Sequence, residues 1–268
     1  MMIPAPCIDQ TADWPTGCES VSAVMLLQYL GVEISVDEFI KEYLPCRLFE
    51  ERDGKQIGAD PRREFAGSPY DPDSMGCYAP VIKAALERVL TERAGQAERS
   101  SEEKRRAGQS DRSSEEKERA GQTDRSSEEK ERAEQSDGIC DEKGRAGQTD
   151  GSSDENQTGN PCWHVKDLTG VSMERICTEY LDRGRPVIFW ACIDMKEPVM
   201  GPDWYLVDGT TVLTWISNEH CLLLVGYDEK NYYFNDPWEH HGTIGYEKTI
   251  TEARHQAQYA MAVAAYRT

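Results

Sequence analysis

The stretch GCESVSAVMLLQYLG, residues 17–31, decides the first half of the fold. Its apolar residues recur at the i, i+3, i+4 spacing that gives a helix one apolar face. They are Val21, Val24, Met25, Leu27 and Leu30. Gly31 ends the pattern, as glycine does at many helix ends. The spacing therefore predicts an amphipathic helix that opens at Cys18 and packs one face against a core.

Helical patterns also follow this stretch, and they dominate the first part of the chain. Residues 35–44 are predicted to form a second helix, with Ser35 as N-cap and Pro45 as the stop. Residues 47–76 are rich in Gly, Pro and Asp and are expected to form a loop. Further helices are expected at residues 79–90, 172–184 and roughly 251–260.

Strand patterns are confined to the second half of the chain. Residues 186–193 form a continuous apolar run, which is typical of a buried strand. Residues 220–227 and 231–236 are two further apolar segments joined by the short polar turn DEK, and they predict an antiparallel hairpin. Helices first and antiparallel strands later predict an α+β fold.

A repeat of 13 residues separates the two halves, and its copies begin at Ala94, Ala107, Ala120, Ala133 and Ala146. Because alanine is usually the only apolar residue of a copy, stacked copies would bury almost nothing. We therefore expect residues 92–160 to be a disordered or weakly helical insertion, either a tolerated low-complexity loop or a regulatory tether. Residues 1–91 and 161–268 are expected to form a single domain around it.

The charge balance excludes several classes of function. The chain has 49 acidic and 30 basic residues and a net charge of −19, so a nucleic-acid binder or a protein of anionic membrane surfaces is not expected. No apolar run approaches the roughly 18 residues of a membrane-spanning helix. The first residues resemble no secretory signal. The chain is thus expected to be cytoplasmic, or secreted if it has been trimmed.

Nine cysteines, an odd number without a CxxC pair, do not form a disulfide framework. Several lie inside apolar runs, as in FWACI and HCLLLV, where cysteine behaves as a small hydrophobic residue. Most are therefore expected to be buried thiols in a reducing compartment.

Cys18 differs from the other cysteines because it opens a helix directly after Gly17. The free N–H groups and partial positive charge of a helix N-terminus favour a thiolate over a thiol. Glycine before it permits a tight turn and leaves space for a substrate. Cys18 is therefore a candidate nucleophile; the alternative is a structural cysteine that happens to begin a helix.

His220 is a candidate base because it begins an apolar strand after the polar turn ISNE. The next strand returns alongside and ends at Asp236. A histidine with a carboxylate on a neighbouring strand end is the arrangement that fixes a histidine tautomer and stabilises its charged form. The strand register cannot be read from the sequence, and either residue alone could be part of a solvated strand end.

Four segments, taken in order, resemble the cysteine peptidases related to the bacteriocin-processing, double-glycine leader peptidases. The first is IDQTADWPTGCESVSAVMLLQYLGVEISVDEFIKEYLP at residues 8–45. FAGSPYDPDSMGCYAPVIKAAL, LTGVSMERICTEYLDRGRPVIFW and HCLLLVGYDEKNYYFNDP follow. The resemblance covers nearly all of the chain except the repeats.

The resemblance implies a papain-like fold, in which a helical half carries the cysteine and a twisted antiparallel half carries the histidine and aspartate. It implies Cys18 as nucleophile, His220 as general base and acid, and Asp236 as the residue that orients the base. It also implies that Gln10 donates its amide to the oxyanion hole beside the Cys18 backbone N–H. A neutral amide there stabilises a developing negative charge without adding a titrating group.

The expected activity is hydrolysis of a peptide or related amide bond by a monomer. Transglutaminase-like acyl transfer and a non-catalytic peptide-binding module remain alternatives. Neither an organic cofactor nor a metal is expected, since no nucleotide fingerprint appears and Glu239, His240 and His241 have no further ligands at a suitable spacing. Trp238 is expected to shield the bond between His220 and Asp236 from water.

Overall fold

The computed structural model describes residues 2–96, 99 and 162–268. The contacts divide the chain into two units, Met1–Ala94 with Pro161–Thr268, and Gly95–Asn160. The elements below belong to the first unit, apart from the end of one helix. The expected disorder or weak helicity of the repeat insertion concerns residues that lie almost entirely outside the described part of the chain.

The helix predicted to open at Cys18 is present as α1, Cys18–Tyr29. Its amphipathic character was predicted wrongly, because every residue from Cys18 to Leu27 is buried, including Glu19, Ser20 and Ser22. The reason is that α1 packs against both β9 and β6 and also contacts α2, so it has no solvent face over its first three turns. Its polar residues must therefore find partners inside the protein.

A six-stranded sheet forms the centre of this unit, in the order β11-β10-β9-β6-β12-β5. The predicted buried strand is β6, Val187–Cys192, and the predicted hairpin is β9, Glu219–Tyr227, with β10, Asn231–Asp236. The sheet is completed by β5, Trp163–Asp167, β11, Gly242–Glu247, and β12, Ala262–Arg267, which the sequence patterns did not predict. All its strand pairs are antiparallel.

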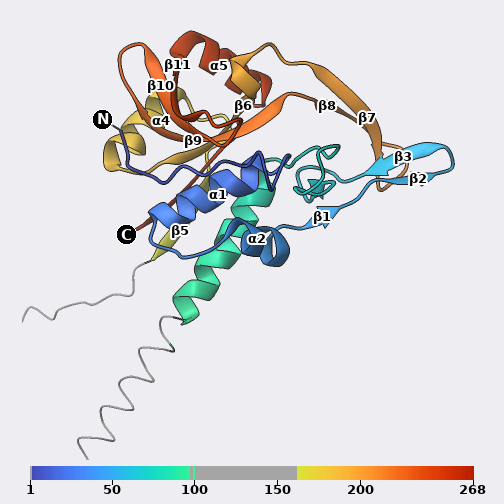
Figure 1. The fold of residues 1–268 in the computed structure, drawn as a ribbon, viewed down its shortest axis with the longest axis horizontal. Helices are drawn as coiled ribbons and strands as arrows, with labels where there is room; N and C mark the ends of the chain where they lie inside the picture. Colours follow the sequence, from blue (N-terminus) through green and yellow to red (C-terminus); the bar gives the residue numbers. More distant parts are fainter. Residues whose placement is uncertain (1, 97–98, 100–161) are drawn as a thin grey trace, which may run out of the picture. The chain divides into compact units, whose positions relative to one another are not determined.

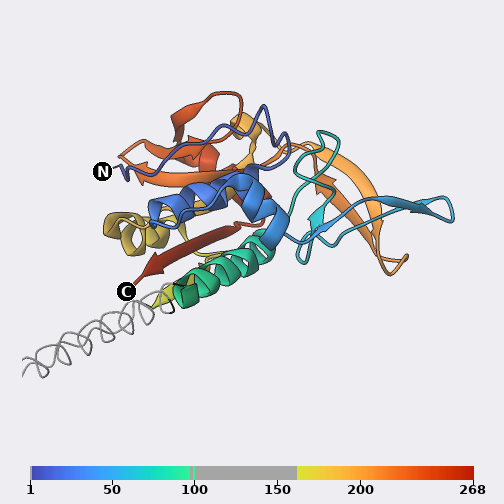
Figure 2. The same cartoon turned by 60° about the horizontal axis from the view of Figure 1, so that its bottom comes forward.

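The two faces of this sheet are covered by different helices (Figures 1 and 2). The helix α5, Lys248–Ala257, contacts β6, β10 and β11, and its His255 stacks on Phe189 with ring centroids 3.9 Å apart. The opposite face contacts α1. In the β6–β9 register Ala191 lies opposite His220 and Cys192 opposite Glu219. Because neighbouring residues of a strand point to opposite faces, His220 shares the α5 face and Glu219 the α1 face.

A separate four-stranded sheet, in the order β2-β3-β7-β8, lies at one end of this unit (Figure 1). Its strands are Glu50–Arg52, Lys55–Gly58, Met200–Leu206 and Val212–Ile216. Two short parallel strands, β1 (Cys46–Arg47) and β4 (Phe65–Ala66), lie nearby in the sequence. The prediction of a loop over residues 47–76 was thus wrong in part. The parallel pairing of β3 with β7 joins segments far apart in sequence, which local patterns do not reveal.

The remaining helices largely follow the prediction. Ser35 caps α2, Val36–Glu38, by accepting a hydrogen bond from the Glu38 N–H at 3.1 Å, and the turn η1, Phe39–Tyr43, continues it. A helix is described over residues 79–96. Helix α4, Met173–Glu179, leads into η2, Leu181–Arg183, and ends at Gly184 with a positive φ of 69°. A further turn, η3, covers Ile193–Met195.

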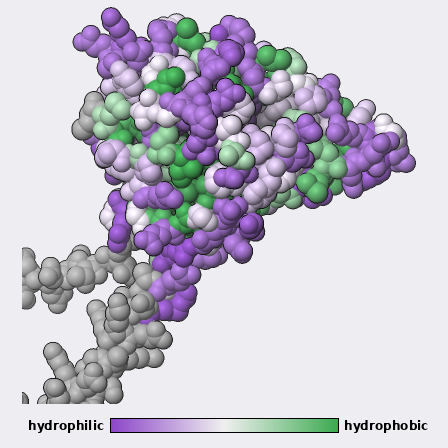
Figure 3. All heavy atoms as spheres, viewed as in Figure 1, coloured by the Kyte–Doolittle hydropathy of each residue, from purple (hydrophilic) through white to green (hydrophobic). Residues whose placement is uncertain are grey.

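Hydrophilic residues cover most of the face in the space-filling view, and smaller apolar patches interrupt them (Figure 3). Of the helices in the described ranges, none has the length and apolar character required to cross a membrane. Five of the eight cysteines in these ranges are buried, and all eight are free thiols.

Candidate functional site

His220 and Asp236 meet as predicted: His220 Nε2 lies 2.7 Å from Asp236 Oδ1, and both side chains are almost fully buried. Burial alone would raise the pKa of Asp236. The hydrogen bond and charge of His220, with contributions from His241 and the Trp238 N–H, outweigh burial and lower this pKa to about 2. An ionised carboxylate can only accept hydrogen bonds, so His220 carries a proton on Nε2 and leaves Nδ1 for proton transfer.

A single irregularity in the hairpin decides which side chain faces His220. Between Tyr233 and Phe234 the register of β10 against β9 shifts by one residue. A continuous register would place Asn235 on the His220 face, because a one-residue slip exchanges the two faces of a strand. With the shift, Asp236 faces His220, and Asn235 instead donates to the carbonyls of Ala5 and Pro6.

Three further groups hold Asp236 in place. Its Oδ1 accepts from the Trp238 N–H at 3.0 Å, and its Oδ2 contacts His241 Nδ1 at 3.0 Å and accepts from the Tyr246 hydroxyl at 3.2 Å. The half-buried Trp238 ring stands edge-on to His220, with centroids 6.3 Å apart and planes at 70°. The sequence predictions did not assign His241 and Tyr246 to this network, although both lie within ten residues of Asp236.

Cys18 is the first residue of α1 and is 5% exposed. Gly17 before it is required by packing, since a Cβ there would lie 2.8 Å from Trp14 Cβ. The Cys18 thiol donates to Glu19 Oε2 at 3.3 Å, and no hydrogen bond joins it to His220. Burial raises the pKa of Cys18 well above its ordinary value, and the charges of Glu19 and Glu219 add to this effect. This arrangement favours a thiol, whereas the helix N-terminus alone predicts a thiolate.

Gln10 is 1% exposed, and its backbone N–H donates to the Pro237 carbonyl at 2.9 Å. This bond fastens the loop before α1 to the end of β10, directly after Asp236. Gln10 Nε2 donates to the Pro15 carbonyl at 3.1 Å, which uses one of its two amide hydrogens. Its Oε1 is buried without a hydrogen-bond partner. The amide is therefore fixed in the interior rather than exposed on a loop.

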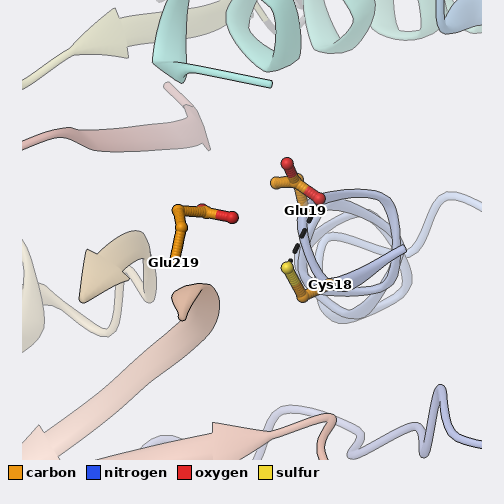
Figure 4. Close-up of side chains that lie close together, drawn as sticks. All are labelled: Cys18, Glu19 and Glu219. Atoms are coloured by element: carbon orange, nitrogen blue, oxygen red, sulfur yellow. Dashed lines mark hydrogen bonds between the residues drawn. The ribbon is translucent and has the colours of Figure 1, made fainter. Parts of the chain in front are cut away.

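The sequence reasoning missed a buried pair of carboxyl groups, Glu19 and Glu219 (Figure 4). One ligand atom from each of Cys18, Glu19 and Glu219 lies within 4.8 Å of the others. Burial raises the pKa of Glu19 to about 7. Burial, and then the charge of Glu19, raise the pKa of Glu219 well above its ordinary range. A signal was available in the sequence, since each glutamate interrupts or borders an apolar run next to a candidate catalytic residue.

The structure thus brings Gln10, Asp236 and His220 together at the end of the hairpin. It places Cys18 beside Glu219, the neighbour of His220 on β9, but on the α1 side of the sheet. Glu239 and His240 are exposed, and His240 pairs with Asp9 at 2.5 Å. No cluster of three metal-ligating side chains includes them within the ranges that the structure covers.

No curated protein matches this chain. Among solved structures, the crystal structure of a candidate C39-like peptidase from Bacillus anthracis matches with a TM-score of 0.65 and 18% sequence identity. The match covers 100% of this chain and 98% of that one, so the two proteins share a fold. The model of the peptidase C39-like family matches residues 2–104 and 126–265. The chain therefore belongs to the peptidase C39-like family, as its resemblance in sequence indicated.

Proposed function

We propose that this protein is a cysteine peptidase with Cys18 as nucleophile, His220 as general base and acid, and Asp236 as the residue that orients His220. The observation that carries the proposal is the buried bond of 2.7 Å between His220 Nε2 and an ionised Asp236. It leaves Nδ1 as the nitrogen that exchanges protons, and it stabilises the imidazolium that forms during the reaction. Membership of the family supports the same assignment.

The reaction has two halves. In the first, the Cys18 proton passes to His220 Nδ1 and the sulfur attacks the peptide carbonyl carbon. The Cys18 backbone N–H and the second amide hydrogen of Gln10 stabilise the oxyanion. His220 then protonates the leaving amine as the C–N bond breaks. In the second half, His220 removes a proton from water and the hydroxyl attacks the carbonyl carbon of the thioester. The C–S bond then breaks, the carboxylic acid product leaves, and His220 returns its proton to Cys18.

This cycle requires Cys18 to exchange its hydrogen-bond partner. In the structure the thiol rests on Glu19, and in the reaction its proton has to reach His220. A thiol is a weak donor, so the contact with Glu19 is easily given up when Cys18 changes rotamer. The sulfur also has to turn from the α1 side around the end of β9, where Glu219 and His220 are consecutive residues, so that it faces His220.

The test compares the full-length protein with its Cys18→Ala variant on a mixture of quenched fluorescent peptides. We expect kcat to fall at least ~10³-fold, because covalent catalysis is lost while the domain stays folded. Cys162→Ser, at an exposed thiol, is the matched control and should keep full activity. Cleavage that persists in Cys18→Ala would refute the assignment.

Adding an excess of a primary amine and measuring product masses separates hydrolysis from acyl transfer. Carboxylic acid products support the peptidase. Amide adducts that predominate over acid products would identify the acyl transferase instead, with the same residues in the same roles.

A further inference from the structure

Glu19 and Glu219 form a buried acidic pair without a compensating cation. Glu19 is fully buried and Glu219 is 8% exposed. Glu19 accepts from the Cys77 N–H and from the Cys18 thiol, but Glu219 Oε1 is buried without any hydrogen-bond partner. No basic side chain pairs with either glutamate in the part of the chain that the structure describes. Such a group is costly to bury, so its retention requires an explanation.

The Glu219 carboxyl group points from β9 toward Glu19 on α1, and the Cys18 sulfur points toward Glu19 (Figure 4). The absence of a side chain at Gly76 leaves room for the two carboxyl groups. A Cβ at Gly76 would lie 2.5 Å from Glu19 Oε1 and 3.1 Å from Glu219 Oε2. Glycine at this position therefore keeps a side chain out of the space between the carboxyl groups and the loop that faces them.

We propose that Cys18, Glu19 and Glu219 form a binding site for a thiophilic divalent cation of the zinc type. One thiolate and two carboxylates suit zinc, which bonds sulfur at ~2.3 Å and carboxylate oxygen at ~2.0–2.2 Å. Tetrahedral ligands at those lengths lie roughly 3.5 Å apart. The three atoms lie within 4.8 Å of one another, so a small inward movement would complete the geometry. Three protein ligands leave one position for an exogenous ligand.

Other common cations fit less well. Calcium requires six to eight oxygen ligands, and magnesium keeps several waters in an octahedral shell. A buried set of three ligands that includes a sulfur satisfies neither ion. Zinc also supplies the positive charge that Glu19 and Glu219 lack.

If Cys18 is the nucleophile of the proposed peptidase, zinc would also act as a reversible inhibitor. The ion would displace the thiol proton, hold the thiolate on the Glu219 side of β9 away from His220, and engage the lone pair that attacks the peptide carbonyl. This consequence rests on the proposed function, whereas metal binding itself does not. Binding is therefore measured without any substrate.

The experiment titrates the metal-free, full-length protein with Zn²⁺ by calorimetry. We expect one tight site, with Kd raised at least ~10-fold in Glu219→Gln and in Cys18→Ser, because each loses one ligand of three. The matched controls are Glu229→Gln and Cys162→Ser, which change the same residue types at exposed positions and should leave Kd unaltered. Circular dichroism establishes that each variant is folded, and Glu19→Gln replaces any that is not.

Titration with Co²⁺ identifies the sulfur. A thiolate-to-metal absorption band is expected in the wild type and in Cys162→Ser and should be missing in Cys18→Ser. If zinc does not bind, or binds with a Kd that Glu219→Gln and Cys18→Ser leave unchanged, the site does not exist and the glutamates simply share a proton. A peptidase that binds no zinc, or a zinc-binding protein that cleaves no peptide, would separate the two proposals.

Discussion

His220 and Glu219 are consecutive residues of β9 and both are buried, yet they have opposite surroundings. On the α5 face, His220 meets Asp236, whose carboxylate has four hydrogen-bonding contacts and a pKa lowered to about 2. On the α1 face, Glu219 has no hydrogen bond at Oε1 and its pKa is raised by burial. Burial raises the pKa of both carboxyl groups, so the partners of Asp236 account for its lowered pKa, and the charge of Glu19 adds to the raised pKa of Glu219.

The largest effect on activity is expected from removing the carboxylate that bonds to His220. Asp236→Asn should lower kcat by ~10³–10⁴-fold, because an amide in this place can donate to His220 and so favours the wrong tautomer. Peptide cleavage under saturating substrate measures it. Glu229→Gln, an exposed change of the same chemical kind, is the control.

A double variant tests the register of the hairpin. Exchanging the two residues, as Asn235→Asp with Asp236→Asn, restores the composition but places the carboxylate on the opposite face of β10. Because the irregularity between Tyr233 and Phe234 sets that face, the double variant should stay as inactive as Asp236→Asn. Recovered activity would mean that the strand slips readily and that the observed register does not control the site.

A second buried histidine on the α5 face, His255, has no carboxylate partner among the described residues, and burial therefore dominates its pKa. His255 is 1% exposed and donates from Nδ1 to the Trp190 carbonyl at 2.9 Å, while its Nε2 has no partner. Burial lowers its pKa to about 4. The unfolded chain therefore binds a proton at higher pH than the folded one. The stabilisation from neutral His255 is complete above about pH 6.5 and is lost as the pH falls toward about 4.

From this difference we expect His255 to contribute about 3 kcal/mol to the loss of stability between pH 6.5 and 4. Urea unfolding of the wild type and of His255→Leu across this range measures it. The difference between the two stability curves should fall steadily as the solution becomes more acid. If the two curves stay parallel, His255 is not buried in its neutral form.

On the other face of the sheet, a substitution should stabilise the protein. Glu219→Gln replaces a carboxyl group that lacks a partner with an amide that can donate to Glu19. We expect the free energy of unfolding of the metal-free protein to rise by ~1–2 kcal/mol at neutral pH. Chemical denaturation in the presence of a chelator measures this change. A decrease in the free energy of unfolding would show that Glu219 already has a partner. The contrast between a partnered Asp236 and an unpartnered Glu219 would then be wrong.

The sequence predicted the elements better than their contacts. The apolar run up to Gly31 located α1, and the turn at residues 228–230 located the hairpin. It could not show that α1 is covered on all sides, since the covering strands lie about 200 residues away. For the same reason it did not predict that Glu19 meets Glu219. The face that Asp236 occupies depends on one irregular pair, which has no sequence signature.

The smallest effect concerns the joint between α1 and β9, which lies one turn from Cys18. The buried Ser22 hydroxyl donates to the Cys221 carbonyl at 3.1 Å and so ties the helix to the strand that carries both Glu219 and His220. Ser22→Ala should lower the free energy of unfolding by ~1 kcal/mol, the usual value of one buried hydrogen bond. The hydroxyl touches neither Cys18 nor Glu219 through any hydrogen bond, so zinc affinity should not change. A variant with normal stability but altered reactivity of Cys18 would mean that this bond positions the helix rather than stabilises it.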